Sequence, residues 1–384
     1  MKIVSIQPLC VNVSAKTNWF FLKVVADNGL VGWGEASLNG YEPLLVEYVR
    51  MLEERAAGSD DASWTNHVRL HPHDPAGLVA HAAKSALEQA LTGIRAQAAG
   101  QPIHAWLGGA KRRAVRVYAN INRRTEDRSP AGCAASAGHA VAEGFGAVKI
   151  APFDGVIPED LHLAAARARV DEGLHRVAAI RAAVGPGVDV MIDCHWRLDE
   201  ATAASVMREL APLRLFWIEC PISEHHAHAA ANVRLRELAN GLGMRMAGAE
   251  HHAGLPAFEP IIAGRWFDVV MPDVKYAGGF HEMLRIADAA AAAGVGFSPH
   301  NPTGPVCNMA SLHLAACAGS FVILEYQHAE SAIFTELTGG VHPRLEDGCF
   351  VVPDAPGLGL TIDEQVARAH PCRPVRPGLD PRLG

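Results

Sequence analysis

The sequence predicts an α/β protein in which a parallel (β/α)8 barrel follows a smaller α+β domain. From about residue 115 onward, eight short apolar segments alternate with Ala-rich helical segments over roughly 215 residues, the number and length expected for such a barrel. Before residue 115, three strand-like segments come first and two helical segments follow, which is the order of an antiparallel α+β unit.

Composition limits the kind of protein. The chain has 384 residues, of which 49% are hydrophobic and 20% charged, values typical of a globular protein. A net charge of -7 without clustered Lys and Arg argues against a nucleic-acid surface. We find no secretory signal and no run of 18 apolar residues, so we expect a cytoplasmic protein without membrane contact. Eight cysteines without CxxC spacing predict free thiols.

The first domain is expected to cover residues 1–114. Alternating apolar residues predict strands at 2–13, 19–26 and 31–37, with Asp27-Asn28-Gly29 as a hairpin turn. Helices are predicted at 42–57 and 77–99, the second ended by Gly100. The loop at 14–18 is free to reach another part of the molecule.

The barrel is expected to cover residues 115–350. Its eight strands are predicted at 115–121, 147–152, 188–194, 214–220, 245–250, 267–273, 294–300 and 321–327. Helices are predicted between them, at 130–143, 170–184, 199–211, 228–241, 255–264, 279–293 and 304–318. The segment 351–384 is rich in Pro and Gly, and we expect it to pack back on the first domain.

Ionisable residues stand at the ends of seven predicted strands. In chain order they are Lys149, Asp193, Glu219, Glu250, Asp273, His300 and Glu325. The C-terminal ends of barrel strands meet at one mouth, where active sites of this fold lie. Because unpaired buried charges are costly, these groups must pair, bind a cation or shift their pKa values. The sequence therefore predicts an active site at this mouth.

Three of these residues predict a metal site. Asp193, Glu219 and Glu250 lie on adjacent strands and offer only oxygen ligands, which Mg²⁺ prefers. Zinc is disfavoured because no HxH or CxxC pair accompanies them. The alternative is a network of carboxylates that form salt bridges with Lys and Arg.

Two histidines are candidate acid or base groups. Asp273 on the preceding strand would fix the tautomer of His300 and raise its basicity, as a general base requires. His195 is two residues after Asp193, so both side chains point to the same face of a strand. Glu325 could bond a substrate carboxylate or pair with a cation.

The ordered set of strand-end residues resembles the enolase superfamily, mandelate racemase subgroup. Segments 27–36 (DNGLVGWGEA), 217–221 (WIECP) and 271–279 (MPDVKYAGG) are similar to motifs of that family. The resemblance covers nearly the whole chain. It implies that the first domain caps the barrel mouth with loops around 14–20. It also implies Mg²⁺ and a carboxylate substrate whose α-proton is removed to give a metal-held enediolate.

Two positions indicate a subfamily. Racemases of the subgroup carry Lys-x-Lys on the second strand, but here Ala151 stands at the second Lys position. The sequence Asp193-Cys194-His195 is similar to the Asp-x-His of galactonate and mannonate dehydratases. The resemblance implies that His300 removes the α-proton, His195 protonates the departing 3-hydroxyl and Lys149 lies near the substrate carboxylate. A further departure is Ala249, where the family usually has Gly before the third ligand.

We therefore expect a Mg²⁺-dependent hydro-lyase that converts a sugar acid, an aldonate or aldarate, into a 2-keto-3-deoxy acid, and that assembles as a homo-oligomer. A cycloisomerase or epimerase acting on a sugar acid or its lactone would use the same metal and His300. A metal hydrolase of the amidohydrolase type would need His-x-His on the first strand, which here ends in Asn120-Ile121-Asn122. The remaining alternative is a degenerate sugar-acid binding protein.

Overall fold

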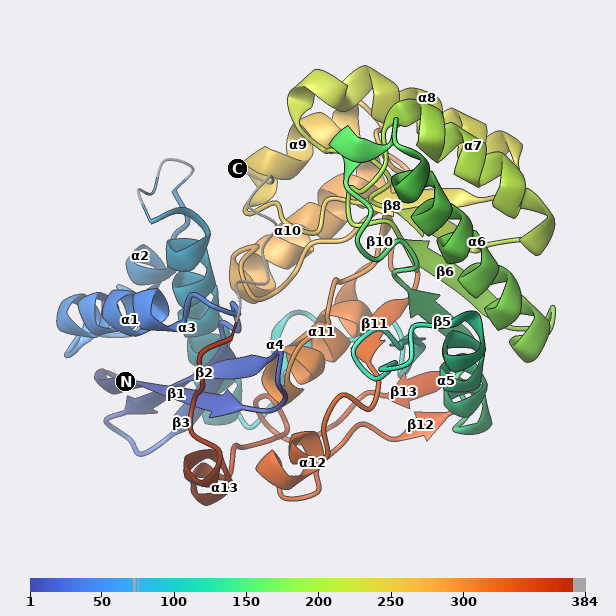
Figure 1. Cartoon of the computed structure of the whole chain (residues 1–384). Helices are drawn as coiled ribbons and strands as arrows, with labels where there is room; N and C mark the ends of the chain where they lie inside the picture. The colour runs from blue at the N-terminus through green and yellow to red at the C-terminus, as the bar shows by residue number, and fades with distance from the viewer. Residues whose placement is uncertain (72–73, 75, 376–384) are drawn as a thin grey trace.

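The N-terminal domain packs a three-stranded sheet against a long helix. In the computed structural model, which describes residues 1–71, 74 and 76–375, the strands β1 (Ile3–Asn12), β2 (Asn18–Ala26) and β3 (Val31–Glu35) pair antiparallel in that order. The helices are α1 (Glu42–Ala56), α2 (Trp64–Val68), α3 (Gly77–Ala98) and α4 (Ile103–Trp106). This arrangement confirms the predicted α+β unit (Figure 1).

The contact between β3 and α3 is close enough to require glycine. A Cβ added to Gly32 would lie 2.1 Å from the carbonyl oxygen of Ala90, and one added to Gly34 would lie 1.8 Å from that of Ala86. The two glycines of β3 therefore allow the strand to approach the helix backbone directly.

The predicted parallel barrel is confirmed. Neighbouring strands pair parallel from β4 to β10, and the last strand, β11, pairs parallel with β4. A single parallel bridge, Phe297 to Phe321, joins the β10 and β11 segments. The strands are β4 (Ala114–Asn120), β5 (Ala147–Ile150), β6 (Asp189–Asp193), β7 (Trp217–Glu219), β8 (Arg245–Gly248), β9 (Val269–Val270), β10 (Gly296–Phe297) and β11 (Leu324–Gln327).

Helices cover the outside of the barrel, as Figure 1 shows. They are α5 (Pro130–Ala142), α6 (Ala164–Val184), α7 (Glu200–Leu210), α8 (Ala229–Gly241), α9 (Leu255–Ala263), α10 (Gly279–Ala292) and α11 (Pro305–Cys317). Short 3₁₀ turns lie at η1 (Pro158–Asp160), η2 (Ala211–Leu213) and η3 (His226–His228). All seven predicted helices are present, but α6 begins at residue 164, earlier than the predicted residue 170.

The interior of the barrel is a packed core. One buried cluster consists of Tyr118, Ala147, Met191, Trp217, Ala247, Val269, Met271 and Ile323. Tyr118 and Trp217 meet edge to face, with ring centroids 5.6 Å apart. This layer separates the strand ends that carry the charged residues from the opposite end of the barrel.

The last part of the chain returns to the N-terminal domain, as expected. Pro371 forms an antiparallel bridge with Val11, and α13 (Glu364–Ala369) contacts β1 (Figure 1). The sequence did not predict the short helices α2, α4, α12 (Ile333–Leu337) and α13. Nor did it predict the hairpin of β12 (Leu345–Glu346) and β13 (Cys349–Val351), whose second strand pairs antiparallel with the start of β4. The domain limits at 114/115 and 350/351 stay predictions.

Among the described residues, no helix is both long enough and apolar enough to cross a membrane.

Candidate active site

A cavity of about 380 Å³ lies at the C-terminal ends of the barrel strands. It brings together six of the residues predicted from the sequence: Lys149, Asp193, His195, Glu250, His300 and Glu325. The N-terminal domain adds Ser37, Leu38 and Asn39 to its wall. Residues from both domains therefore enclose one space.

Lys149 is the buried cation of the site. Its Nζ lies 2.8 Å from an oxygen of Glu219 and 2.8 Å from one of Glu325, and all three side chains are at most 1% exposed. Burial disfavours the charged amine, but the two carboxylates outweigh it and raise the pKa of Lys149 well above its usual range. Glu325 also accepts hydrogen bonds from Asn120 Nδ2 and from the backbone of Asn301, both at 2.8 Å. Glu325 thus pairs with a cation, and a bond to a substrate carboxylate stays a prediction.

The acidic residues form a cluster beside Lys149. Asp193, Glu219 and Cys220 each place one potential ligand atom within 4.8 Å of the others. Burial raises the pKa of Glu219 to about 8, against the opposing charge of Lys149. Burial also raises the pKa of the Cys220 thiol well above its usual range, so this sulfur is protonated and a poor ligand for a hard cation.

Glu250, the predicted third ligand, lies outside that compact group, but its buried carboxyl group is incompletely hydrogen-bonded. Its Oε2 is buried and has no hydrogen-bond partner. Burial, followed by the charges of Asp193 and Glu219, raises the pKa of Glu250 well above its usual range. Asp193 thus opposes the ionisation of Glu219 and Glu250, and a divalent cation between these carboxylates would relieve the repulsion.

The backbone is strained where three adjacent strands end. After β6, His195 and Trp196 have φ values of 47° and 54°; after β7, Cys220 has 45°; and after β8, Ala249 has 74°. Residues with a Cβ rarely adopt this left-handed conformation, and each costs on the order of 1 kcal/mol or more. Gly adopts this conformation without strain, which is a physical reason for the Gly that the family resemblance implies at position 249.

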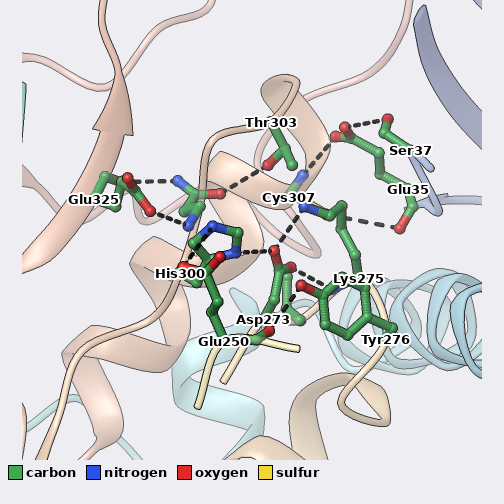
Figure 2. A network of polar contacts seen from close by, with 12 residues as sticks. Glu35, Ser37, Glu250, Asp273, Lys275, Tyr276, His300, Thr303, Cys307 and Glu325 are labelled. Carbon is green, nitrogen blue, oxygen red and sulfur yellow. Dashed lines mark hydrogen bonds and ion pairs between the residues drawn. The ribbon is translucent and has the colours of Figure 1, made fainter. Parts of the chain in front are cut away.

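His300 is held between two carboxylates (Figure 2). Its Nδ1 lies 2.7 Å from Asp273 Oδ2, and its Nε2 lies 3.4 Å from Glu250 Oε2. Burial opposes ionisation of Asp273, but Lys275 and His300 lower its pKa below the usual range. An ionised Asp273 accepts the Nδ1 proton and leaves Nε2 of His300 as the basic atom.

His195 lines the cavity on the side of β6. Its Nε2 lies 2.7 Å from Asp193 Oδ2, and its side chain is 40% exposed. Burial lowers the pKa of His195, but the charge and hydrogen bond of Asp193 outweigh burial and raise it. The imidazole therefore holds a proton more readily than a free histidine and remains accessible from the cavity.

Several residues of the cavity were not predicted from the sequence. Lys275 donates to Asp273 Oδ2 at 2.6 Å, and the Tyr276 hydroxyl donates to the backbone oxygen of Glu250 at 2.7 Å. His251 and Trp196 lie with ring centroids 4.8 Å apart, and burial lowers the pKa of His251 to about 4. The lysine was visible in the sequence, two residues after Asp273 in the segment 271–279.

The loop expected to close the mouth lies beside the cavity. Residues 37–39, after β3, line the cavity, and residues 14–20 do not. Instead, the hydroxyls of Ser14 and Thr17 donate to the carboxylate of Glu330, which also pairs with Arg123 at 2.9 Å. Glu330, whose side chain is 3% exposed just after β11, thus holds the 14–17 loop beside the mouth, and its closing over a bound substrate stays a prediction.

Two family models match the chain. The model described as "Mandelate racemase / muconate lactonizing enzyme, N-terminal domain" matches residues 4–108, and the model described as "Enolase C-terminal domain-like" matches residues 132–366. Together they cover both domains seen in the structure.

Individual proteins are similar over nearly the full chain. A D-galactonate dehydratase of Verminephrobacter eiseniae is 30% identical over 370 residues, 92% of each chain. A solved mandelate racemase/muconate lactonizing enzyme of Jannaschia sp. CCS1 is 27% identical with a TM-score of 0.86, covering 99% of this chain and 100% of that one. A structure from Burkholderia xenovorans, provisionally named an L-alanine-DL-glutamate epimerase and bound to magnesium and fumarate, is 25% identical with a TM-score of 0.84, covering 96% of each chain.

Proposed function

The chain belongs to the mandelate racemase / muconate lactonizing enzyme family of the enolase superfamily, and from this premise we propose that it dehydrates a sugar acid in a Mg²⁺-dependent reaction. The substrate is an aldonate or aldarate with hydroxyl groups on carbons 2 and 3, and the product is a 2-keto-3-deoxy acid. The similarity to D-galactonate dehydratase supports this type of reaction.

Asp193, Glu219 and Glu250 would hold the cation. Their carboxylate donors, the closeness of Asp193 to Glu219 and the buried Glu250 oxygen without a hydrogen-bond partner support this assignment. When bound, the cation would stabilise the negative charge that develops on the substrate carboxylate. Lys149, already charged and buried, would add to that stabilisation from the protein side.

Two histidines carry the proton transfers. His300, with Nδ1 bonded to Asp273, removes the α-proton through Nε2. His195 then donates a proton to the 3-hydroxyl, which leaves as water. The observation that carries this assignment is that His195 lines the same cavity as His300, while Ala151 occupies the position of a second lysine base.

Epimerisation is the second candidate, supported by the similarity to the protein provisionally named an epimerase. It would begin with the same loss of the α-proton to His300. It would end with return of a proton to carbon 2 and would leave the 3-hydroxyl in place. Product analysis therefore separates the two reactions.

The test is to incubate the chain and Mg²⁺ with a panel of aldonates and aldarates in D₂O. We expect a 2-keto-3-deoxy acid from at least one substrate. His195→Asn should stop its formation while exchange of the α-proton continues, and His300→Asn should stop both, with losses of about 10²- to 10⁴-fold. Unchanged formation of the 2-keto-3-deoxy acid by His195→Asn would overturn the role of His195 as the acid. Absence of this product from every substrate would overturn the dehydratase assignment, and an epimer with an intact 3-hydroxyl would favour the second candidate.

A further inference from the structure

The two barrel helices that follow the Asp273 and His300 segments do not cap their own first turns. α10 is preceded by Gly278 and α11 by Gly304, and neither residue offers a side chain to the free amides. By contrast, Ser129 caps α5 and Asp199 caps α7 from within the barrel. The first-turn amides of α10 and α11 must find acceptors elsewhere.

The N-terminal domain supplies the acceptor for α11. The carboxylate of Glu35, the last residue of β3, accepts hydrogen bonds from the backbone amides of Gly304 at 2.8 Å and Cys307 at 2.9 Å (Figure 2). Ser37 donates a third bond to the same carboxylate at 2.7 Å. Glu35 is fully buried, so these hydrogen bonds replace the water that an exposed carboxylate would bind.

The same domain supplies the acceptor for α10. Glu88 on α3 accepts from the amide of Phe280 at 2.7 Å, and Ser85 accepts from the amide of Gly278 at 2.9 Å. A Cβ on Gly279 would lie 1.9 Å from Glu88 Oε2, so this glycine leaves the space that the carboxylate fills. Gly279, the second of the two glycines that end the 271–279 motif, thus leaves room for a carboxylate from the N-terminal domain.

A third contact joins the two capping sites. Gln89, next to Glu88 on α3, donates to the backbone oxygen of Val274 at 3.0 Å and accepts from the backbone amide of Glu35 at 3.1 Å. Val274 directly follows Asp273. One face of α3 therefore fixes the segment after Asp273, and β3 fixes the segment after His300.

From this geometry we propose that Glu35 and Glu88 are positioning residues for the Asp273–His300 pair, which they act on through the first turns of α11 and α10. The N-terminal domain then does more than cover the cavity, because it holds two strand ends at the spacing that proton transfer needs. The kinetic part of this proposal rests on the proposed function.

The kinetic test uses Glu35→Gln and Glu88→Gln in the full chain. We expect kcat to fall about 10- to 100-fold with little change in KM, because a small displacement of a base affects the transition state more than ground-state binding. With substrate deuterated at carbon 2, the isotope effect on kcat should rise, since proton removal becomes more rate-limiting. A smaller fraction of folded protein would change neither KM nor the isotope effect.

Arg112→Gln is the matched control. The Arg112 guanidinium donates to the carbonyl oxygens of Ala315 and Ala318 at the opposite end of α11, so its loss weakens the same helix away from His300. We expect its isotope effect to equal that of the unchanged chain. If the Gln variants do not fold, Glu35→Asp keeps the charge but shortens the reach to the amides, and it should show the same kinetic pattern.

A measurement without substrate separates this inference from the proposed function. The Nδ1 proton of His300, bonded to Asp273, should give an NMR signal whose exchange with water is faster in Glu35→Gln and Glu88→Gln than in Arg112→Gln. An unchanged signal, or kinetic losses equal to those of the control, would overturn the positioning role. If no sugar acid is dehydrated, the proposed function fails, and the NMR comparison still decides this inference.

Discussion

Single residues at the barrel mouth show that charge balance dominates the site. Lys149 shares its charge between Glu219 and Glu325, while Oε2 of Glu250 is buried without a hydrogen-bond partner. The mouth therefore holds more carboxyl groups than its buried lysine can pair with. Two predictions about individual side chains follow from this imbalance.

Replacing Lys149 by Met should destabilise the protein by about 3–5 kcal/mol, because two buried carboxylates would lose their partner. Denaturant unfolding without Mg²⁺ measures the change. The double variant Lys149→Met/Glu325→Gln is the control and should recover part of the loss, since one of the orphaned charges is removed. A midpoint equal to that of the unchanged chain would contradict the importance of this pair.

Mg²⁺ should raise the unfolding temperature, because a ligand that binds only the folded chain stabilises it by mass action, about 2.7 kcal/mol at 100 times its Kd. Asp193→Asn should remove most of this effect, since it removes one of the carboxylates in the cluster. Thermal unfolding over a range of MgCl₂ concentrations measures the response, with NaCl at equal ionic strength as the control. An equal response in the variant would place the cation elsewhere.

The sequence could predict which residues reach the mouth but not how they pair. A buried strand that ends in a polar residue is visible in the sequence, and this signal found Lys149, Glu219 and Glu325. It could not show that Lys149 lies between the other two, because pairing depends on the barrel's stagger. Nor could it show the nearness of Cys220 to Asp193, which depends on a left-handed turn after β7.

At the scale of elements, close backbone contacts decide where glycine is needed. β3 meets α3 through Gly32 and Gly34, whose missing side chains let the strand lie against helix carbonyls. Since β3 also ends in Glu35, the fit of this strand affects the cap of α11 as well as the N-terminal core.

Gly34→Ala should destabilise the protein by about 1–3 kcal/mol, because the added methyl would overlap the backbone of Ala86 and force the two elements apart. Gly138→Ala in α5 is the matched control. Its added Cβ would meet no atom within 4 Å, so this variant should be neutral or more stable by up to about 1 kcal/mol. Urea unfolding of both variants measures the difference; equal values would contradict the close-contact argument.

The elements missed from the sequence are short. The hairpin β12–β13 carries a two-residue turn at Asp347-Gly348, with φ values of 49° and 72°, which is a recognised hairpin signal. Its strands are only two and three residues long and alternate weakly, so they gave no strand pattern of their own. The long barrel elements were predictable because a parallel sheet buries both faces of each strand.

At the scale of the whole molecule, the domains also meet through a pair of buried histidines. His104 in α4 and His313 in α11 stack with ring centroids 5.4 Å apart. His313 donates from Nε2 to the carbonyl oxygen of Leu358, and its Nδ1 accepts from the backbone amide of His104. This arrangement suits a neutral imidazole, because a proton on Nδ1 would face another donor.

Acid should therefore weaken the fold. Burial lowers the pKa of His313 to about 4, whereas an unfolded His titrates near 6.5. Between these values the unfolded chain binds a proton that the folded chain does not, so the free energy of unfolding falls as the pH drops from 6.5 to 4. The contribution is on the order of a few kcal/mol.

The comparison is between the unchanged chain and His313→Gln, unfolded with urea at several pH values from 4 to 6.5. The variant should show a shallower loss of stability with acid, because it lacks the buried group that titrates. Equal slopes would mean that other groups account for the acid sensitivity.

The pairing of β4, the first barrel strand, with strands near the end of the chain limits when the barrel can close during synthesis. β4 pairs with β5, which follows soon after it, but also with β11 and β13, more than two hundred residues downstream. At about 5–20 residues per second, a ribosome would need on the order of 10–40 s to make the chain between β4 and β11. During that time one edge of β4 offers unpaired backbone groups to other chains. We therefore expect nascent chains truncated before β11 to aggregate or to depend on chaperones.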